Sequence, residues 1–196
     1  MKVKRNKLGA KDLIVAGAFA ALYVVLLMVV VSLLGFIPIT YILAPFFISV
    51  VLGPVYMLYV MKVPKTGAII ILAAVVGLVT SMGGVWYAFI WSMFLGIIAE
   101  LIARAGRYKS KKMYGASFSI FACANMGPFL ILAFSKSTFL KACLEYYGQD
   151  YVDTLDRLTP SWIILALMAL AFAGGIIGSI IGTNILKKHF EKAGIV

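Results

Sequence analysis

The chain has 196 residues, of which 63% are hydrophobic, and its mean hydropathy is +1.05. Soluble domains have about 45–50% apolar residues, so this composition excludes an ordinary soluble globule and a disordered chain. The formal net charge is +11, from 18 Lys and Arg against 7 Asp and Glu. Charged residues are nevertheless absent from residues 13–61, 66–99, 113–135 and 158–186. A helix crosses the hydrocarbon layer with about 20 residues, so the sequence predicts an integral membrane protein.

Glycine-containing breaks at residues 35–38 and 81–84 divide the two longest uncharged stretches into two helices each. The predicted spans are residues 12–34, 40–61, 65–80, 85–103, 112–134 and 161–188. All of them are expected to be helical, because lipid offers backbone groups no hydrogen-bond partner. The fold class is therefore an all-α bundle of six transmembrane helices. It forms a single domain over residues 1–196, with a long outer loop at 135–160.

The basic residues give the orientation of this six-span arrangement. Fifteen of the 18 Lys and Arg residues lie in the N-terminal tail, the loops after the second and fourth spans, and the C-terminus. These segments share one side of the membrane, and cytoplasmic loops are rich in Lys and Arg. We therefore expect a multi-pass protein of the cell membrane with both termini in the cytoplasm. The positive net charge then marks the cytoplasmic side of the membrane, where basic residues meet anionic lipid headgroups. It gives no support to a nucleic acid partner.

Reactive groups are sparse in the predicted spans. The sequence contains no phosphate-binding P-loop, no H-E-x-x-H and no G-x-S-x-G pattern. The one histidine, His189, has no Cys or His neighbour at metal-ligand spacing. Two acids are expected to be structural: Asp12 as the N-cap of the first helix, and Glu100 in a pair with Arg104 one turn later. We therefore expect no enzyme activity, no cofactor and no metal.

Strips of small residues on two spans would let another helix approach closely. The residues are Ala16, Gly17, Ala20 and Ala21 in the first span, and Gly174, Gly178 and Gly182 in the last. The first strip fits either packing within the chain or docking of a partner. We assign the last strip to packing within the bundle, since a six-helix bundle must close somewhere.

Four side chains in the outer half are candidate solute-binding residues: Trp86, Tyr87, Trp91 and Asn125. Aromatic residues at membrane interfaces commonly form a belt, but Trp91 lies deeper than a belt explains. Asn125 falls mid-span, where an amide without a partner costs roughly 2–7 kcal/mol. It therefore needs a protein partner or a ligand.

Apolar residues recur at helical spacing between Phe139 and Tyr147 in the outer loop. This pattern predicts a short amphipathic helix over the outer face. Long loops over a site often act as lids, and Tyr146 and Tyr147 would then belong to the lid. A surface connector is an equally open interpretation.

Several blocks of this sequence resemble the substrate-binding S components of energy-coupling factor (ECF) transporters. The first block comprises residues 7–14 and 17–22, where Gly17 and Ala21 match the A-x-x-x-A strip of that family with Gly in place of the first Ala. Blocks at 53–58, 62–68, 99–102 and 107–112 are similar to the Trep_Strep branch of these S components. From residue 135 onward the resemblance lies only in topology.

The resemblance implies a mechanism. An S component captures a scarce micronutrient outside the cell and docks its first helix on a transmembrane coupling subunit. Two ATPase subunits then power release of the solute inward, which agrees with the missing P-loop here. Two alternatives stay open. One is a self-sufficient facilitator or channel, for which the Gly-Pro pairs at 53–54 and 127–128 hint at an inverted repeat. The other is a non-transporting accessory subunit.

Overall fold

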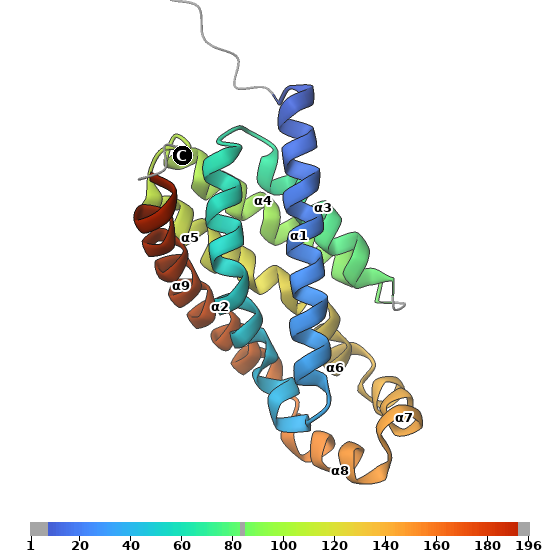
Figure 1. Ribbon diagram of the computed structural model, residues 1–196. Helices are drawn as coiled ribbons and strands as arrows, with labels where there is room; N and C mark the ends of the chain where they lie inside the picture. The colour runs from blue at the N-terminus through green and yellow to red at the C-terminus, as the bar shows by residue number, and fades with distance from the viewer. Residues whose placement is uncertain (1–7, 83–84, 192–196) are drawn as a thin grey trace, which may run out of the picture.

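A computed structural model describes residues 8–82 and 85–191, and within these ranges all regular structure is helical (Figure 1). Most of the N-terminal basic residues, Lys192 and the glycines of the predicted break at 81–84 lie outside the described residues, as does the side chain of His189. In chain order the elements are α1 (Ala10–Gly35), α2 (Pro38–Lys62), α3 (Ala68–Ser81), α4 (Tyr87–Ala105), α5 (Lys111–Ala122), the 3₁₀ segment η1 (Cys123–Leu130), α6 (Ile131–Phe134), α7 (Lys136–Tyr147), α8 (Gln149–Leu158), α9 (Ile163–Ile185) and the π-helical turn η2 (Leu186–Glu191).

Five helical segments are long and apolar enough to cross a membrane. They are α1, α2, α4, the run Lys111–Phe134 formed by α5, η1 and α6, and the run Ile163–Lys188. These candidate spans coincide with five of the six predicted ones. The exception is α3. Its 14 residues extend about 21 Å at 1.5 Å per residue, whereas the hydrocarbon core is about 30 Å thick. The count of six complete spans is therefore not confirmed.

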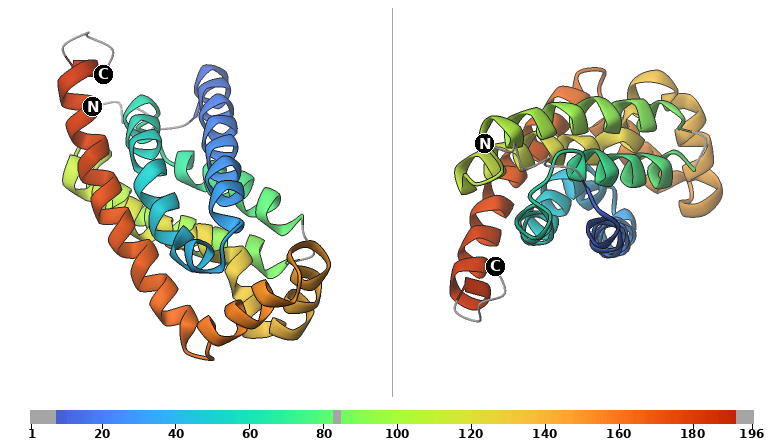
Figure 2. Two further views of the ribbon diagram at one scale, coloured as in Figure 1. Left: turned by 60° about the horizontal axis from the view of Figure 1, so that its bottom comes forward. Right: turned by 90° about the horizontal axis from the view of Figure 1, so that it is seen from above.

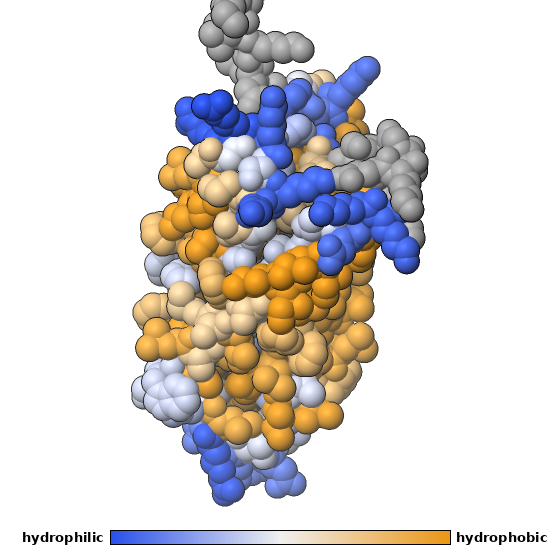
Figure 3. Space-filling view, turned by 90° about the vertical axis from the view of Figure 1, so that its left-hand side faces the viewer, coloured by the Kyte–Doolittle hydropathy of each residue, from blue (hydrophilic) through white to orange (hydrophobic). Residues whose placement is uncertain are grey.

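The helices do not all run parallel. In the view from above, α1 and α2 are seen end-on while α3 and α4 run across them side by side (Figure 2). The α1 helix stands at the margin of the bundle and is the least buried of the five candidate spans. Space-filling shows hydrophilic surface at both ends of the molecule and an apolar band between them, as a membrane protein requires (Figure 3).

The two ends of the bundle differ in chemistry. At one end lie the start of α1, the turns α2–α3 and α4–α5, and η2 (Figure 1). We name it the basic end, because these segments carry most of the Lys and Arg residues. At the other end the chain folds into α7 and α8, which we name the α7–α8 end. The sequence predicts one short helix here, but Gly148, with φ +83°, turns the chain between two helices. Glycine suits this left-handed conformation because it has no Cβ.

The closest helix packing in the bundle joins α9 to α2. A Cβ atom at Gly182 would lie 2.9 Å from the Cα of Pro54, and one at Gly178 would collide with the backbone carbonyl oxygen of Ser49. Real side chains do not fit at such distances, so these glycines set how closely the helices approach. The assignment of the Gly174, Gly178 and Gly182 strip to packing within the bundle is confirmed.

Asp12 ties the start of α1 to the α2–α3 turn. The N-cap residue of α1 is Gly9, so the prediction that Asp12 is the N-cap is wrong. Asp12 lies in the first turn instead, and its Oδ2 accepts a hydrogen bond from the Gly9 backbone nitrogen at 2.7 Å. The same oxygen forms an ion pair with Nζ of Lys65 at 2.6 Å. An acid in the first turn is also favoured by the helix dipole.

Candidate functional site

The small-residue strip of α1 is divided between two faces of the helix. Ala16 and Ala20 are buried within the bundle, on the same face as Tyr23. Gly17 and Ala21 are exposed, and a Cβ at Gly17 would meet nothing within 4 Å. Packing within the chain therefore accounts for Ala16 and Ala20, whereas Gly17 and Ala21 make no such contact. Only Gly17 and Ala21 lie where another protein can reach them.

Asn125 has a protein partner, Tyr23 of α1. The Asn125 side chain is 3% exposed, its Nδ2 donates to the Tyr23 hydroxyl at 3.0 Å, and that hydroxyl donates to Oδ1 at 3.4 Å. Tyr23 is not among the predicted site residues, although a tyrosine in the middle of a span lies too deep for an interfacial belt. Its position three residues after Ala20 places it on the buried face of α1.

The predicted aromatic residues of α4 separate into deep and surface positions. Trp91 is half-buried and its Nε1 donates to the carbonyl oxygen of Cys123 at 2.8 Å, two residues before Asn125. Trp91 thus attaches to η1, the segment that contains Asn125. Trp86 is 68% exposed at the start of α4, as an interfacial belt residue would be. Tyr87 packs edge-on against Phe134, with ring centroids 5.2 Å apart.

The two tyrosines predicted for the lid lie at exposed positions of α7. Tyr146 is exposed, and Tyr147 stacks on Tyr151, whose hydroxyl donates to the carbonyl of Gly35 at 2.8 Å. These contacts fasten α7 and α8 to the α1–α2 turn. From α7, the partly buried Phe139 and the buried Cys143 face the interior, and both lie in the apolar pattern that predicts this helix.

A stack of three rings leads from α7 to η1. The ring of Phe139 lies 5.9 Å from that of Tyr41 in α2, and Tyr41 lies 4.9 Å from Phe129 in η1. Phe129 lies four residues after Asn125 in the same segment. The α7–α8 end therefore closes the Asn125 region with aromatic side chains from three elements.

Glu100 is a buried carboxylate with a structural role. It is 4% exposed, and it accepts hydrogen bonds from the backbone nitrogens of Gly67 and Ile69, both at 3.0 Å. These N–H groups at the start of α3 have no partner within the helix. None of the hydrogen bonds that Glu100 accepts comes from Arg104, so the predicted pair is replaced by a helix cap.

Tyr108 completes the surroundings of Glu100. Its hydroxyl donates to Oε1 of Glu100 at 2.7 Å, from a loop in which Arg107 and Tyr108 both have positive φ. Burial, together with the hydrogen bond to Glu100, raises the pKa of Tyr108 to about 12. The hydroxyl therefore stays protonated and keeps donating at physiological pH.

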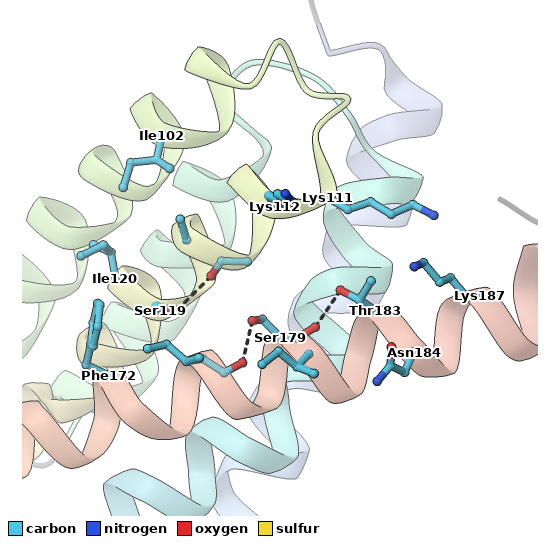
Figure 4. A pocket seen from close by; sticks show the side chains of 14 residues that line it. Ile102, Lys111, Lys112, Ser119, Ile120, Phe172, Ser179, Thr183, Asn184 and Lys187 are labelled. Carbon is cyan, nitrogen blue, oxygen red and sulfur yellow. Dashed lines mark hydrogen bonds between the residues drawn. The ribbon is translucent and has the colours of Figure 1, made fainter.

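A large cavity lies between α4, α5 and α9 near the basic end (Figure 4). Its volume is about 800 Å³, within the roughly 300–1,000 Å³ typical of ligand sites. None of the predicted site residues lines it. A signal was present, since Ser179, Thr183 and Lys187 recur every four residues on α9 and so share one helix face.

The helical architecture, the apolar band and the two polar ends define a polytopic integral membrane protein. A family model described as "Hypothetical bacterial integral membrane protein (Trep_Strep)" matches residues 10–192. The chain therefore belongs to this Trep_Strep family. No curated protein and no solved structure matches the chain.

Proposed function

We propose that the chain is the substrate-binding S component of an ECF-type importer. In this role it captures a small micronutrient outside the cell and passes it inward with a transmembrane coupling subunit and two ATPase subunits. The chain itself is not an enzyme and needs no cofactor. The observation that carries the proposal is the exposed half of the α1 strip.

The exposed face of α1 is suited to another helix more than to lipid. Gly17 and Ala21 lie one turn apart with open space beside Gly17. Lipid tails gain nothing from small side chains, whereas a second helix can approach the backbone closely there and gain van der Waals contacts. The coupling subunit would dock on this face.

The solute would bind around the Asn125–Tyr23 pair, with Trp91 beside it. These groups combine a buried amide, a hydroxyl and an indole, which suits an uncharged polar solute. Entry would require α7 to move Phe139 away from Tyr41. In the corresponding orientation, the basic end faces the cytoplasm and the α7–α8 end faces outside, as the positive-inside rule favours.

Docking is tested by co-purification with the coupling and ATPase subunits. Gly17→Arg and Ala21→Arg should reduce the recovered subunits at least tenfold, because a long cation blocks close helix approach. Ile97→Arg is the matched control: Ile97 is 45% exposed on α4, at a similar number of residues from the basic end of its helix. Equal recovery with Gly17→Arg and Ile97→Arg would contradict the docking proposal.

Solute binding is tested by native mass spectrometry of the purified chain, which detects a retained small molecule by its mass. Asn125→Leu should abolish retention. Trp86→Ala, at the exposed start of α4, tests whether the site extends to the surface. Retention of the molecule by both variants would place the site elsewhere, and a wild-type chain without any bound molecule would favour an accessory subunit. Transport by the chain alone in ATP-free liposomes would favour a facilitator.

A further inference from the structure

The cavity between α4, α5 and α9 has apolar walls that open toward lipid. Phe172, Ile176 and Ile180 of α9 contribute to it and are 40%, 43% and 55% exposed. Ile102 of α4 and Ile120 of α5 line the opposite wall. Gly115 and Ala116 between them carry little side chain, which leaves the space open. The result is a groove along the membrane-facing surface (Figure 4).

The end of this groove nearest the basic end is cationic. Lys111 and Lys112 from α5 and Lys187 from the end of α9 line it, and the side chains of Lys111 and Lys187 extend toward the same space (Figure 4). The lining residues, all within the described part of the chain, include no Asp or Glu. A negative group in the groove would therefore meet positive charge from its lining residues.

Hydroxyl groups lie between the cationic end and the apolar walls. Ser119, Ser179 and Thr183 each donate a hydrogen bond to a carbonyl of their own helix, at 3.0, 2.8 and 2.8 Å. This satisfies their protons inside the membrane, while the oxygen lone pairs stay able to accept. From one end to the other, the groove runs from ammonium groups through hydroxyls to branched aliphatic and aromatic side chains.

We propose that this groove binds an anionic membrane phospholipid. Lys112 and Lys187 hold its phosphate, the hydroxyl belt faces its glycerol and ester groups, and one acyl chain lies along Ile120, Phe172 and Ile176. The change from polar to apolar along the groove matches a phospholipid. A free phosphate ion would leave the apolar walls of the groove uncovered. Basic pockets between spans on one side of a membrane protein commonly take such headgroups. The proposal does not depend on the proposed transport function.

The test is native mass spectrometry of the full chain from nanodiscs of equal phosphatidylglycerol and phosphatidylcholine. The wild-type chain should retain phosphatidylglycerol in preference. Lys112→Ala combined with Lys187→Ala should lower this preference by about fivefold for each lysine, following the contribution of a basic residue near a membrane surface. The matched control, Arg104→Ala with Lys188→Ala, removes two exposed cations of the same end that do not line the groove.

A second variant tests the apolar part. Ala116→Phe fills the groove and keeps every lysine, so it should also lose bound phosphatidylglycerol, while glycerol 1-phosphate should not compete with the lipid. Three results would overturn the proposal: equal loss in the control pair, equal retention of phosphatidylcholine by the wild type, or full retention in Ala116→Phe. Competition by glycerol 1-phosphate would assign the site to a soluble phosphate compound instead.

Discussion

At the scale of single residues, Glu100 joins three segments of the basic end. Its carboxylate accepts from the start of α3 and from Tyr108 in the α4–α5 loop. A buried acid within a span is often a sign of ion coupling. Here its oxygens are occupied by two backbone N–H groups and a hydroxyl, so the acid serves as a cap.

Glu100→Gln should destabilise the protein by about 1–3 kcal/mol, because the amide replaces an accepting oxygen with a donor that faces an N–H group. The measurement is the thermal unfolding midpoint in detergent. Glu145→Gln, at an exposed position of α7, is the control and should leave the midpoint unchanged. An equal midpoint for both variants would show that the cap contributes no stability.

The partners of the polar residues lie far away in the chain, which limits what the sequence can predict. That Asn125 needs a partner follows from its depth alone, but Tyr23 is separated from it by 102 positions. The expected pair of Glu100 and Arg104 rests on a local rule for exposed helix faces, whereas Glu100 is buried against α3. Local spacing predicts which residues need partners, and the packing of the helices decides which partner they obtain.

At the scale of elements, the α2–α9 contact has little tolerance for added volume. We expect Gly178→Ala to destabilise the protein by roughly 1–3 kcal/mol, since the new methyl group meets α2 backbone that cannot rotate away. Gly17→Ala is the matched control on an open helix face, where helix propensity favours Ala by at most about 1 kcal/mol. Both are measured by thermal unfolding. A Gly178→Ala protein as stable as Gly17→Ala would contradict the packing described for α9.

The attachment of α7 and α8 can be followed through Cys143. Its thiol is 6% exposed, and burial raises its pKa, so maleimide should react slowly. Tyr151→Phe removes the hydrogen bond to Gly35, worth about 1 kcal/mol, and should increase the labelling rate about fivefold. A Cys123→Ser background leaves Cys143 as the reporter, and Tyr146→Phe, at an exposed ring, is the control. An unchanged rate in Tyr151→Phe would mean that this bond does not hold α7 and α8 closed.

Helices of the membrane core were predictable because hydropathy and the length of uncharged stretches report them directly. The division of residues 135–160 into α7 and α8 depends on one glycine with positive φ, and the groove depends on how three helices diverge. Neither property is a feature of one helix taken alone. The two halves of the α1 strip likewise differ only in burial, since neighbouring helices cover Ala16 and Ala20 and leave Gly17 and Ala21 exposed.

At the scale of the whole molecule, the distribution of charge and the apolar band agree with one another. Basic residues gather at one end, and the opposite end carries α7 and α8 with most of the described acids. The family match covers residues 10–192, which include all of the described helices. The proposed docking face, solute site and lipid groove occupy different parts of this architecture: the margin at α1, the interior at η1, and the surface between α5 and α9.

The short α3 helix has a consequence for the surrounding bilayer. It is about 9 Å shorter than the hydrocarbon core and runs obliquely to α1 and α2 (Figure 2), so lipids beside it must compress or admit water. Such hydrophobic mismatch costs a fraction of a kcal/mol per ångström. We expect the unfolding temperature to be higher in short-chain than in long-chain phosphatidylcholine bilayers, with the reverse order arguing against thinning. A bilayer that is thinner beside α3 would make it easier for the whole bundle to tilt, because the hydrocarbon layer on the α3 side of the bundle would already be thinner.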